Sequence, residues 1–171
     1  QAMIELEEQS RMLLEGKKVE AKVLPQRIGF NLFPQIDVFL DNEYTKEEMK
    51  KLYEARKIMH HPELMVSCTC VRVPVLRAHS EALNLEFEND VTPDEARAIL
   101  SKAPGVQVKD NPSEKVYPMP IDATGMYDVL VGRIRQDCSR GDKRGLDIFV
   151  SGDQLLKGAA LNAVQIAELL N

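Results

Sequence analysis

Residues 154–170 constrain the fold more than any other segment, because they predict a helix that is apolar on every side. The apolar positions are Leu155, Leu156, Ala159, Ala160, Leu161, Ala163, Val164, Ile166, Ala167, Leu169 and Leu170. Such a helix must be covered all round, and one sheet covers only one of its faces. We therefore expect another domain or subunit to pack against it. The alternative is a central helix that this domain buries alone.

Composition is typical of a globular domain and excludes several classes of function. The 171 residues include 22 Lys and Arg against 27 Asp and Glu, a net charge of −5. This acidic balance argues against nucleic acid or a membrane surface as a partner. No apolar run approaches the roughly 18–20 residues of a membrane span. The odd number of cysteines and an N-terminus unlike a signal peptide favour a cytoplasmic location.

Helices are predicted over 1–15, 45–60, 92–103 and 154–170, with Asp153 placed to cap the last. The second and third begin with capping boxes, Thr45 with Glu48 and Thr92 with Glu95. Strands are predicted at 19–24, 64–73, 79–89, 106–110, 127–136 and 145–151, the last two as a hairpin. We expect 28–40 to be extended and 111–125 to be a loop. The pattern indicates the α+β class, with a mixed, largely antiparallel sheet covered by helices.

Two side chains near residue 75 are candidates for chemistry. His79 stands at a strand entrance, which suits a general acid/base, although a structural role is the alternative. Arg72 lies in an apolar segment, where a guanidinium favours a planar anion or an internal ion pair. Because Pro74 breaks the strand between them, both can converge at one sheet end. His60 and His61 lack further ligands at metal spacing, so no metal site is predicted.

Glu54 and Lys57 share a helix face three residues apart. Their default interpretation is a surface ion pair, and the functional alternative is a site for an ammonium group and an anion. Cys68 and Cys70 also share a face and are expected to pack in the core, while Cys138 lies in a charged loop. The chain carries no glycine-rich nucleotide motif.

Four blocks carry the most specific pattern: EARKIM at 54–59, CVRVPVLRAHSE at 70–81, VGRIR at 131–135 and LLKGAALNAVQIAE at 155–168. A fifth block, FNLFPQID, occupies 30–37. Together they resemble the aspartate-semialdehyde dehydrogenase family in order and over nearly the whole chain. That family reduces L-aspartyl 4-phosphate with NADPH to L-aspartate 4-semialdehyde, in the biosynthesis of lysine, threonine, methionine and isoleucine.

The resemblance implies one catalytic and dimerisation domain over 1–171, similar to the C-terminal domain of the glyceraldehyde-3-phosphate dehydrogenase-like family. The family's N-terminal nucleotide-binding domain and its cysteine nucleophile, in an S-N-C-T type motif, are expected outside this chain. The chain alone is therefore expected to be inactive. The parent enzyme is expected to be a homodimer that uses NADP, bound mainly by the other domain, with Asn162 and, as a weaker candidate, Gln165 near the nicotinamide.

By the same resemblance, His79 is the general acid/base for a small-molecule substrate. Arg72 would bind the substrate carboxylate, Lys57 its phosphate and Glu54 its ammonium group. The alternative from another class is a non-catalytic dimerisation or ligand-binding module of similar fold.

Overall fold

The computed structural model describes residues 1–170. The chain divides into two compact units, one spanning Gln1–Leu76 and the other beginning at Arg77. Each unit has a hydrophobic core of its own, so each is described separately. No helix within the described residues is both long and apolar enough to cross a lipid bilayer. The assignment of one functional domain to 1–171 stays a prediction.

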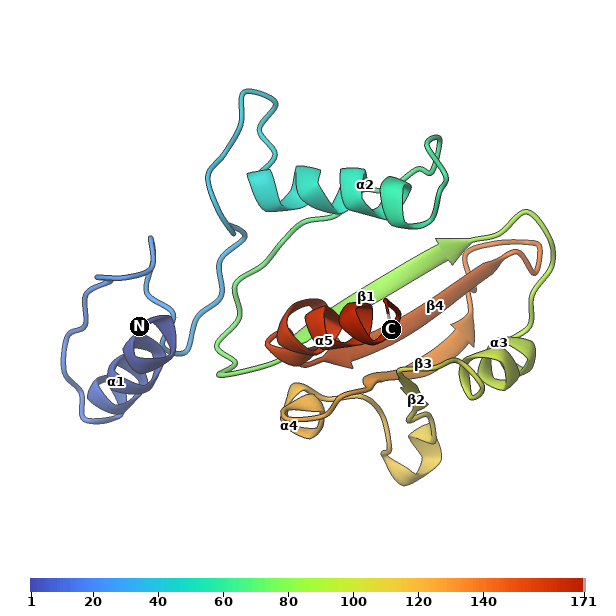
Figure 1. The fold of residues 1–171 in the computed structure, drawn as a ribbon. Coiled ribbons are helices and arrows are strands. Elements are labelled where there is room, and N and C mark those ends of the chain that lie inside the picture. Colours follow the sequence, from blue (N-terminus) through green and yellow to red (C-terminus); the bar gives the residue numbers. More distant parts are fainter. Residues whose placement is uncertain (171) are drawn as a thin grey trace. The chain divides into compact units, whose positions relative to one another are not determined.

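The first unit is built on two helices, α1 (Ala2–Leu14) and α2 (Lys46–Ile58), joined by a long irregular segment (Figure 1). Both predicted helices are confirmed within two residues at either end. Leu6 of α1 packs with Ile28 and Phe33 of the irregular segment, and these three side chains form the buried core. Three side chains bury only a small apolar area, so buried polar groups must also stabilise this unit.

The strand predicted over 19–24 is wrong, and a buried carboxylate explains why. Glu5 of α1 is only 7% exposed. Its carboxylate accepts hydrogen bonds from the backbone N–H groups of Lys22 at 2.5 Å and Leu24 at 2.9 Å. The N–H of Val23 lies between them, 3.2 Å from either carboxylate oxygen. These donors are satisfied by a side chain and are therefore not available to a neighbouring strand.

The strand predicted over 64–73 is also wrong. Within this segment a single β-bridge forms, between Arg72 and Phe33. The Arg72 N–H donates to the Phe33 carbonyl at 2.8 Å, and the Phe33 N–H donates to the Arg72 carbonyl at 3.1 Å. Pro34 and Pro74 flank the bridge and have no N–H to extend it. Segment 64–73 is rich in β-branched residues, but beyond this one bridge it has no neighbouring strand to pair with among the described residues.

The capping box predicted for α2 is confirmed. The hydroxyl of Thr45 accepts from the Glu48 N–H at 3.3 Å, and the Glu48 carboxylate accepts from the Thr45 N–H at 2.8 Å. The other Glu48 oxygen accepts from the backbone N–H of Cys70 at 2.8 Å. Glu48 therefore ties the first turn of α2 to the segment that leads into Arg72.

The second unit contains a four-stranded sheet with the order β1-β4-β3-β2 (Figure 1). Its strands are β1 (His79–Glu86), β2 (Val106–Val108), β3 (Val129–Gln136) and β4 (Gly145–Gly152). β4 pairs antiparallel with β1 and β3, and β2 pairs parallel with β3. The predicted mixed, largely antiparallel sheet and its hairpin are confirmed.

One face of this sheet is covered by α3 (Pro93–Leu100), which begins with the predicted capping box of Thr92 and Glu95. Ala96 of α3 packs against Val131 of β3 and Leu146 of β4 in the main core of the unit. The helix and the sheet therefore form the two layers expected of an α+β domain.

Residues 111–125, predicted as a loop, contain two short helical turns instead. These are η1 (Pro112–Glu114) and α4 (Pro120–Ala123). A proline opens each turn, where its fixed φ suits a helix and its missing N–H has no intrahelical partner to lose. Ala123 is fully buried and belongs to a cluster with Leu130 of β3. Neighbouring residues of a strand point to opposite faces, so α4 covers the face that α3 leaves open.

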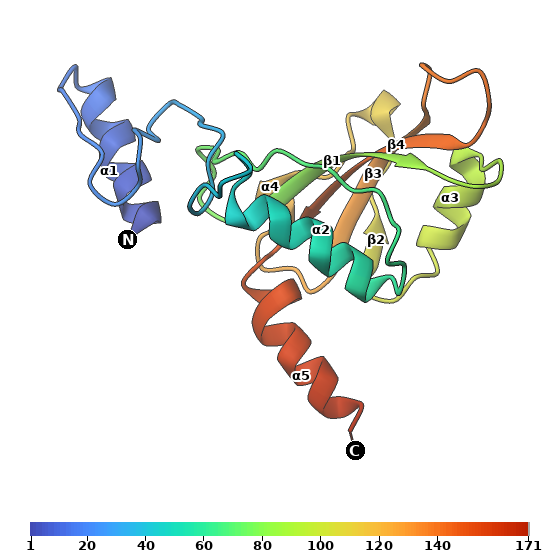
Figure 2. The same ribbon diagram turned by 90° about the horizontal axis from the view of Figure 1, so that it is seen from above.

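The last helix, α5 (Leu161–Glu168), is shorter than predicted. The preceding turn, η2 (Leu156–Ala160), contains non-helical residues at 157–159, where Gly158 has a φ of +95°. Glycine adopts this left-handed conformation without the clash that a Cβ would cause, and the chain kinks there. Figure 2 shows α5 projecting beyond the end of β4. None of its residues is buried, and its expected cover stays a prediction.

Candidate active site

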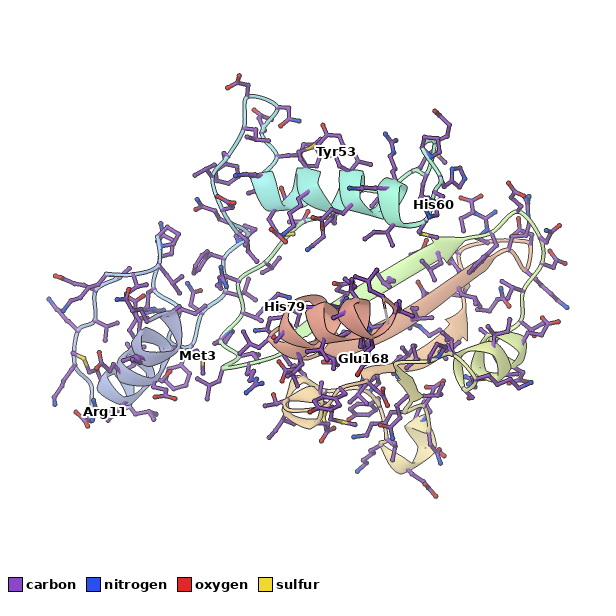
Figure 3. All side chains as sticks on the ribbon, in the orientation of Figure 1. Met3, Arg11, Tyr53, His60, His79 and Glu168 are labelled. Atoms are coloured by element: carbon purple, nitrogen blue, oxygen red, sulfur yellow. The ribbon has the colours of Figure 1, made fainter. Side chains whose placement is uncertain are left out.

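His79 is the first residue of β1 and is exposed (Figure 3). It pairs with Gly152 at the end of β4, and its carbonyl accepts a hydrogen bond from Ser151 Oγ at 3.2 Å. Ser151 Oγ also lies 2.8 Å from Ser80 Oγ. The predicted place at a strand entrance is confirmed, and the catalytic role stays a prediction. An accessible imidazole on an ordered strand is suited to proton transfer with a bound molecule.

An ion pair that sequence reasoning missed lies directly before His79. A terminal guanidinium nitrogen of Arg77 is 2.8 Å from Oδ2 of Asp153, whose side chain is fully buried. Asp153 also accepts from the N–H groups of Gly125 at 2.7 Å and Leu155 at 3.0 Å. Burial raises the pKa of Asp153, but these donors and Arg77 outweigh it and hold the pKa below its ordinary value. The only signal in the sequence is an acid directly after an apolar strand, which equally fits a helix cap.

The two predicted cofactor residues both bond to the kink before α5. Asn162 Oδ1 accepts from the Gly158 N–H at 3.0 Å, and Gln165 Oε1 accepts from Lys157 Nζ at 2.8 Å. Both side chains are half-buried. These bonds hold the kink in place, and a cofactor contact stays a prediction.

Arg72 is half-buried, and its backbone is fixed by the bridge to Phe33. Its Nε is buried and has no hydrogen-bond partner among residues 1–170. The internal ion pair considered as an alternative is not found among the described residues. A buried donor without an acceptor is costly, so an anionic ligand at this guanidinium would be favourable.

Glu54 and Lys57 lie on the exposed side of α2, together with Tyr53 and Ile58. The ion pair expected by default between Glu54 and Lys57 is absent from the described part of the chain. Salt bridges on this helix instead join Glu47 to Lys50 at 3.2 Å and to Lys51 at 2.6 Å. Both charges of the predicted site are therefore open to solvent and to ligands.

The predicted site residues fall into two groups. Arg72, Glu54 and Lys57 belong to the first unit, where Glu48 links α2 to the segment before Arg72. His79, Asn162 and Gln165 belong to the second unit, where β1 and β4 place His79 next to the strand that leads into the kink. The convergence of Arg72 and His79 at one site stays a prediction.

Cys68 and Cys70, predicted to pack in the core, belong to none of the hydrophobic cores found among the described residues. Cys68 and Cys70 are free and half-buried. Burial, with the neighbouring Cys68 and Glu48, raises the pKa of the Cys70 thiol to about 11. A thiol protonated at neutral pH is a poor nucleophile. Among the described residues, no three His, Cys, Asp or Glu side chains are grouped as a metal site would require.

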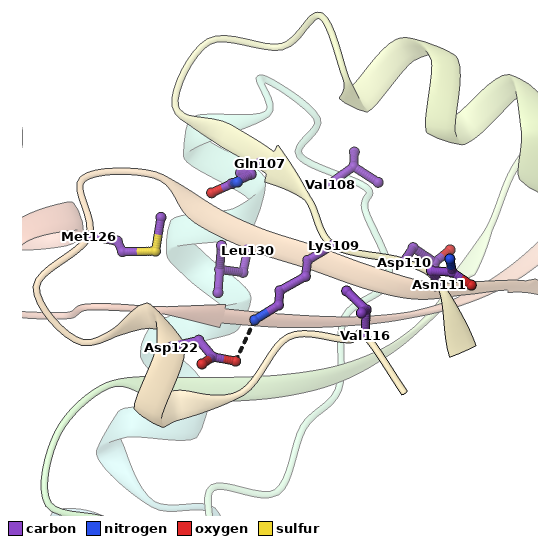
Figure 4. A pocket seen from close by; sticks show the side chains of 9 residues that line it. All are labelled: Gln107, Val108, Lys109, Asp110, Asn111, Val116, Asp122, Met126 and Leu130. Atoms are coloured by element: carbon purple, nitrogen blue, oxygen red, sulfur yellow. Dashed lines mark hydrogen bonds and ion pairs between the residues drawn. The ribbon is translucent and has the colours of Figure 1, made fainter. Parts of the chain in front are cut away.

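An open pocket of about 710 Å³ lies beside β2 (Figure 4). It is lined by Gln107, Val108, Lys109, Asp110, Asn111, Val116, Asp122, Met126 and Leu130. The ion pair of Lys109 with Asp122, at 2.5 Å, occupies its polar side. None of the predicted site residues lines it, so it is not part of the candidate active site.

Comparison with known proteins gives a consistent result. The family model described as semialdehyde dehydrogenase, dimerisation domain, matches residues 1–157. The aspartate-semialdehyde dehydrogenase of Synechocystis sp. is 53% identical over 169 residues, which are 99% of this chain and 49% of that protein. The corresponding protein of Aquifex aeolicus is 52% identical over 170 residues, with the same coverage of both chains.

Solved structures agree. Aspartate semialdehyde dehydrogenase II from Vibrio cholerae, complexed with ASA, has a TM-score of 0.92 and 43% identity, over 98% of this chain and 49% of that one. The Candida albicans enzyme with NADP has a TM-score of 0.69 and 26% identity, over 86% of this chain and 46% of that one. The chain therefore spans about half the length of these relatives. Through its match over residues 1–157, the chain belongs to the semialdehyde dehydrogenase dimerisation-domain family.

Proposed function

We propose that this chain is the substrate-binding and subunit-contact half of an NADP-dependent aspartate-semialdehyde dehydrogenase. Its partners would be a nucleotide-binding domain in the same protein and a second copy in a cytoplasmic homodimer. The identity of 53% over 99% of the chain supports the family reaction. The observation that carries the substrate role is the buried Nε of Arg72, which has no partner among the described residues.

His79 would act as the general acid/base. The family reaction requires the thiol proton to be removed before the sulfur attacks the acyl carbon, where a thioester forms and phosphate leaves. It also requires proton transfer at the tetrahedral intermediate. An imidazole titrates near neutral pH and can do both. The thiol itself would come from the other half of the enzyme, because none of Cys68, Cys70 and Cys138 stands in an S-N-C-T type motif.

The first unit would supply the charges that recognise the substrate. Arg72 would bind the carboxylate through two guanidinium N–H groups, a geometry that a lysine lacks. Lys57 would bind the phosphate as a point charge, and Glu54 would bind the ammonium group. The exposure of both side chains on α2 agrees with these roles.

Two amide side chains of α5 fit a nicotinamide. Asn162 uses its oxygen to accept from Gly158, which leaves its amide NH₂ to donate to a carbonyl. Gln165 uses its oxygen to accept from Lys157 in the same way. NADPH, when bound, supplies the hydride. In this proposal Asn162 orients the nicotinamide ring and Gln165 supports the kink beside it.

The test uses the full-length enzyme that carries this chain. His79→Asn is expected to lower kcat by about 10²–10⁴-fold, the usual contribution of a general acid/base. Arg72→Lys is expected to raise KM for the substrate about tenfold or more, because the paired hydrogen bonds are lost. His60→Asn, an exposed histidine just beyond the end of α2, is the matched control and should leave both constants unchanged.

A His79→Asn enzyme with the kcat of the parent would overturn this function. So would a coding sequence that lacks, upstream of Gln1, a glycine-rich βαβ unit and an S-N-C-T type cysteine. That result would favour the non-catalytic module instead.

The chain by itself should bind a ligand without turning it over. Calorimetric titration with an aspartate analogue should show binding that Arg72→Ala abolishes. Turnover by the isolated chain that depends on His79 would contradict the assignment of the nucleophile to the other half.

A further inference from the structure

We propose that Arg77 and Asp153 form a positioning pair that fixes the backbone of His79 at the entrance of β1. The catalytic consequence rests on the proposed function of His79, but the fixed geometry does not. The pair holds the two residues before His79 in one conformation. A second set of contacts holds the strand after it.

The Asp153 carboxylate is the centre of this arrangement. It is fully buried and receives three donors from three parts of the second unit. Gly125 lies in the loop between α4 and β3, Leu155 follows β4, and Arg77 precedes β1. Removing any donor would leave a buried acceptor without its full set of partners. The position of Arg77 is therefore set by the body of the unit.

Ala78 shows that the turn into β1 is held under constraint. It has a φ of +75°, in the left-handed region that residues with a Cβ seldom adopt. Such residues persist where the surrounding structure fixes them. Ala78 is also buried in the cluster of Ala123 and Leu130. Packing of the methyl group and anchoring of Arg77 together fix the direction in which the chain enters His79.

The contacts after the turn complete the support. His79 is in register with Gly152, and its carbonyl accepts from Ser151 Oγ at 3.2 Å. These backbone contacts set the position of the His79 Cα and Cβ, from which the imidazole extends. The carboxylate that anchors Arg77 also accepts from Leu155, two residues before the Lys157 of the kink. Asp153 therefore orients both the general acid/base and the start of the predicted cofactor segment.

The experiment compares Arg77→Gln with Arg77→Lys in the full-length enzyme. Glutamine removes the charge that pairs with Asp153, and lysine keeps it. Arg135→Gln is the matched control, because Arg135 pairs with Asp147 on the same sheet at 3.4 Å and has no contact with the β1 entrance. The readouts are kcat, KM and the ¹³C resonance of the His79 ring, assigned by its loss in His79→Asn.

Arg77→Gln should shift or broaden the His79 resonance and lower kcat about ten- to hundredfold, with KM changed less than about twofold. Arg77→Lys should restore the resonance and bring kcat within about threefold of the parent. Arg135→Gln should change none of the three. A purely structural role of the pair would lower the melting temperature of Arg77→Gln and leave the resonance and the kcat of the folded enzyme in place.

An unchanged His79 resonance in folded Arg77→Gln overturns the inference. If Arg77→Gln does not fold, Ala78→Gly takes its place, because glycine accepts the positive φ without strain and loosens the turn. It should broaden the His79 resonance and lower kcat with little change in melting temperature, and an unchanged resonance again overturns the inference. A kcat insensitive to His79→Asn, with the resonance still moved by Arg77→Gln, refutes the proposed function and leaves the positioning pair intact.

Discussion

At the scale of single residues, three buried carboxylates order parts of the chain that no strand pairing holds. Glu5 receives backbone N–H groups at 22–24, Glu48 receives that of Cys70, and Asp153 receives those of Gly125 and Leu155. Each acceptor is charged, so each hydrogen bond is stronger than one between neutral groups. The irregular backbone is thereby satisfied without a sheet.

Glu5 gives a pH-dependent prediction. Burial raises the pKa of Glu5, but the N–H donors of Lys22, Leu24 and Val23 outweigh burial and place the pKa below the ordinary 4.5. A lowered folded-state pKa stabilises the protein above pH 4.5, and this stability is lost as the pH falls through the folded-state value. Glu5→Gln should therefore lower the free energy of unfolding by about 1–3 kcal/mol at pH 7.

Urea denaturation at pH 7 and at pH 3 measures this effect, with the exposed Glu7→Gln on the same helix as the control. The difference between Glu5→Gln and the parent should shrink at pH 3, because the carboxylate then takes up a proton in the unfolded chain and this favours unfolding of the parent. A difference that is equal at both pH values would show that the charge of Glu5 contributes nothing.

At the scale of elements, structure encoded by a few neighbouring residues could be predicted from the sequence, whereas structure that depends on a distant partner could not. The capping boxes of α2 and α3 and the hairpin of β3 and β4 are encoded within a few residues, and all three are confirmed. The strands expected at 19–24 and 64–73 fail because β-propensity cannot specify a distant partner, and here a carboxylate or a single bridge takes that place. The kink at Gly158 interrupts an apolar pattern that by itself predicts a continuous helix.

Of the candidate site, the sequence located His79 at a strand entrance. It could not identify the ion pair of Arg77 with Asp153. These residues are 76 positions apart in the chain and meet only through the pairing of β1 with β4. An ion pair of this kind leaves no periodic or motif signal. A buried acid becomes recognisable only once the fold has brought its donors together.

The two capping boxes make a matched pair of tests. Thr45→Ala and Thr92→Ala each remove a hydroxyl that accepts an N–H in the first turn, at a cost of about 1 kcal/mol. Thr45 is fully buried, whereas Thr92 is half-buried, so water replaces the lost acceptor less readily at α2. Thr45→Ala should therefore have the larger effect.

Native-state hydrogen exchange separates the two effects. Thr45→Ala should reduce the protection of amides in α2, and Thr92→Ala should reduce it in α3. Equal loss of protection in both helices from either substitution would contradict two locally independent caps.

At the scale of the whole molecule, the described part of the chain leaves apolar side chains in and just after α5 exposed. Val164 and Ile166 of α5 are 55% and 60% exposed, and Leu169 and Leu170, just beyond its end, are 86% and 83% exposed. Monomeric proteins seldom leave apolar side chains gathered on a helix open to water. The relatives are about twice as long as this chain, and we expect their further half to cover α5.

A comparison of the isolated chain with the proposed full-length enzyme tests this cover. We expect the amides of α5 to exchange rapidly in the isolated chain and to be protected in the full-length enzyme. Val164→Glu should then destabilise only the full-length enzyme, by about 1–3 kcal/mol, because burying an unpaired charge is unfavourable only where there is a partner surface. Glu168→Gln, at the end of the same helix, serves as the polar control. If Val164→Glu leaves the full-length enzyme as stable as the parent, the exposed side of α5 remains in water there, and the other half of the enzyme must dock on a different surface.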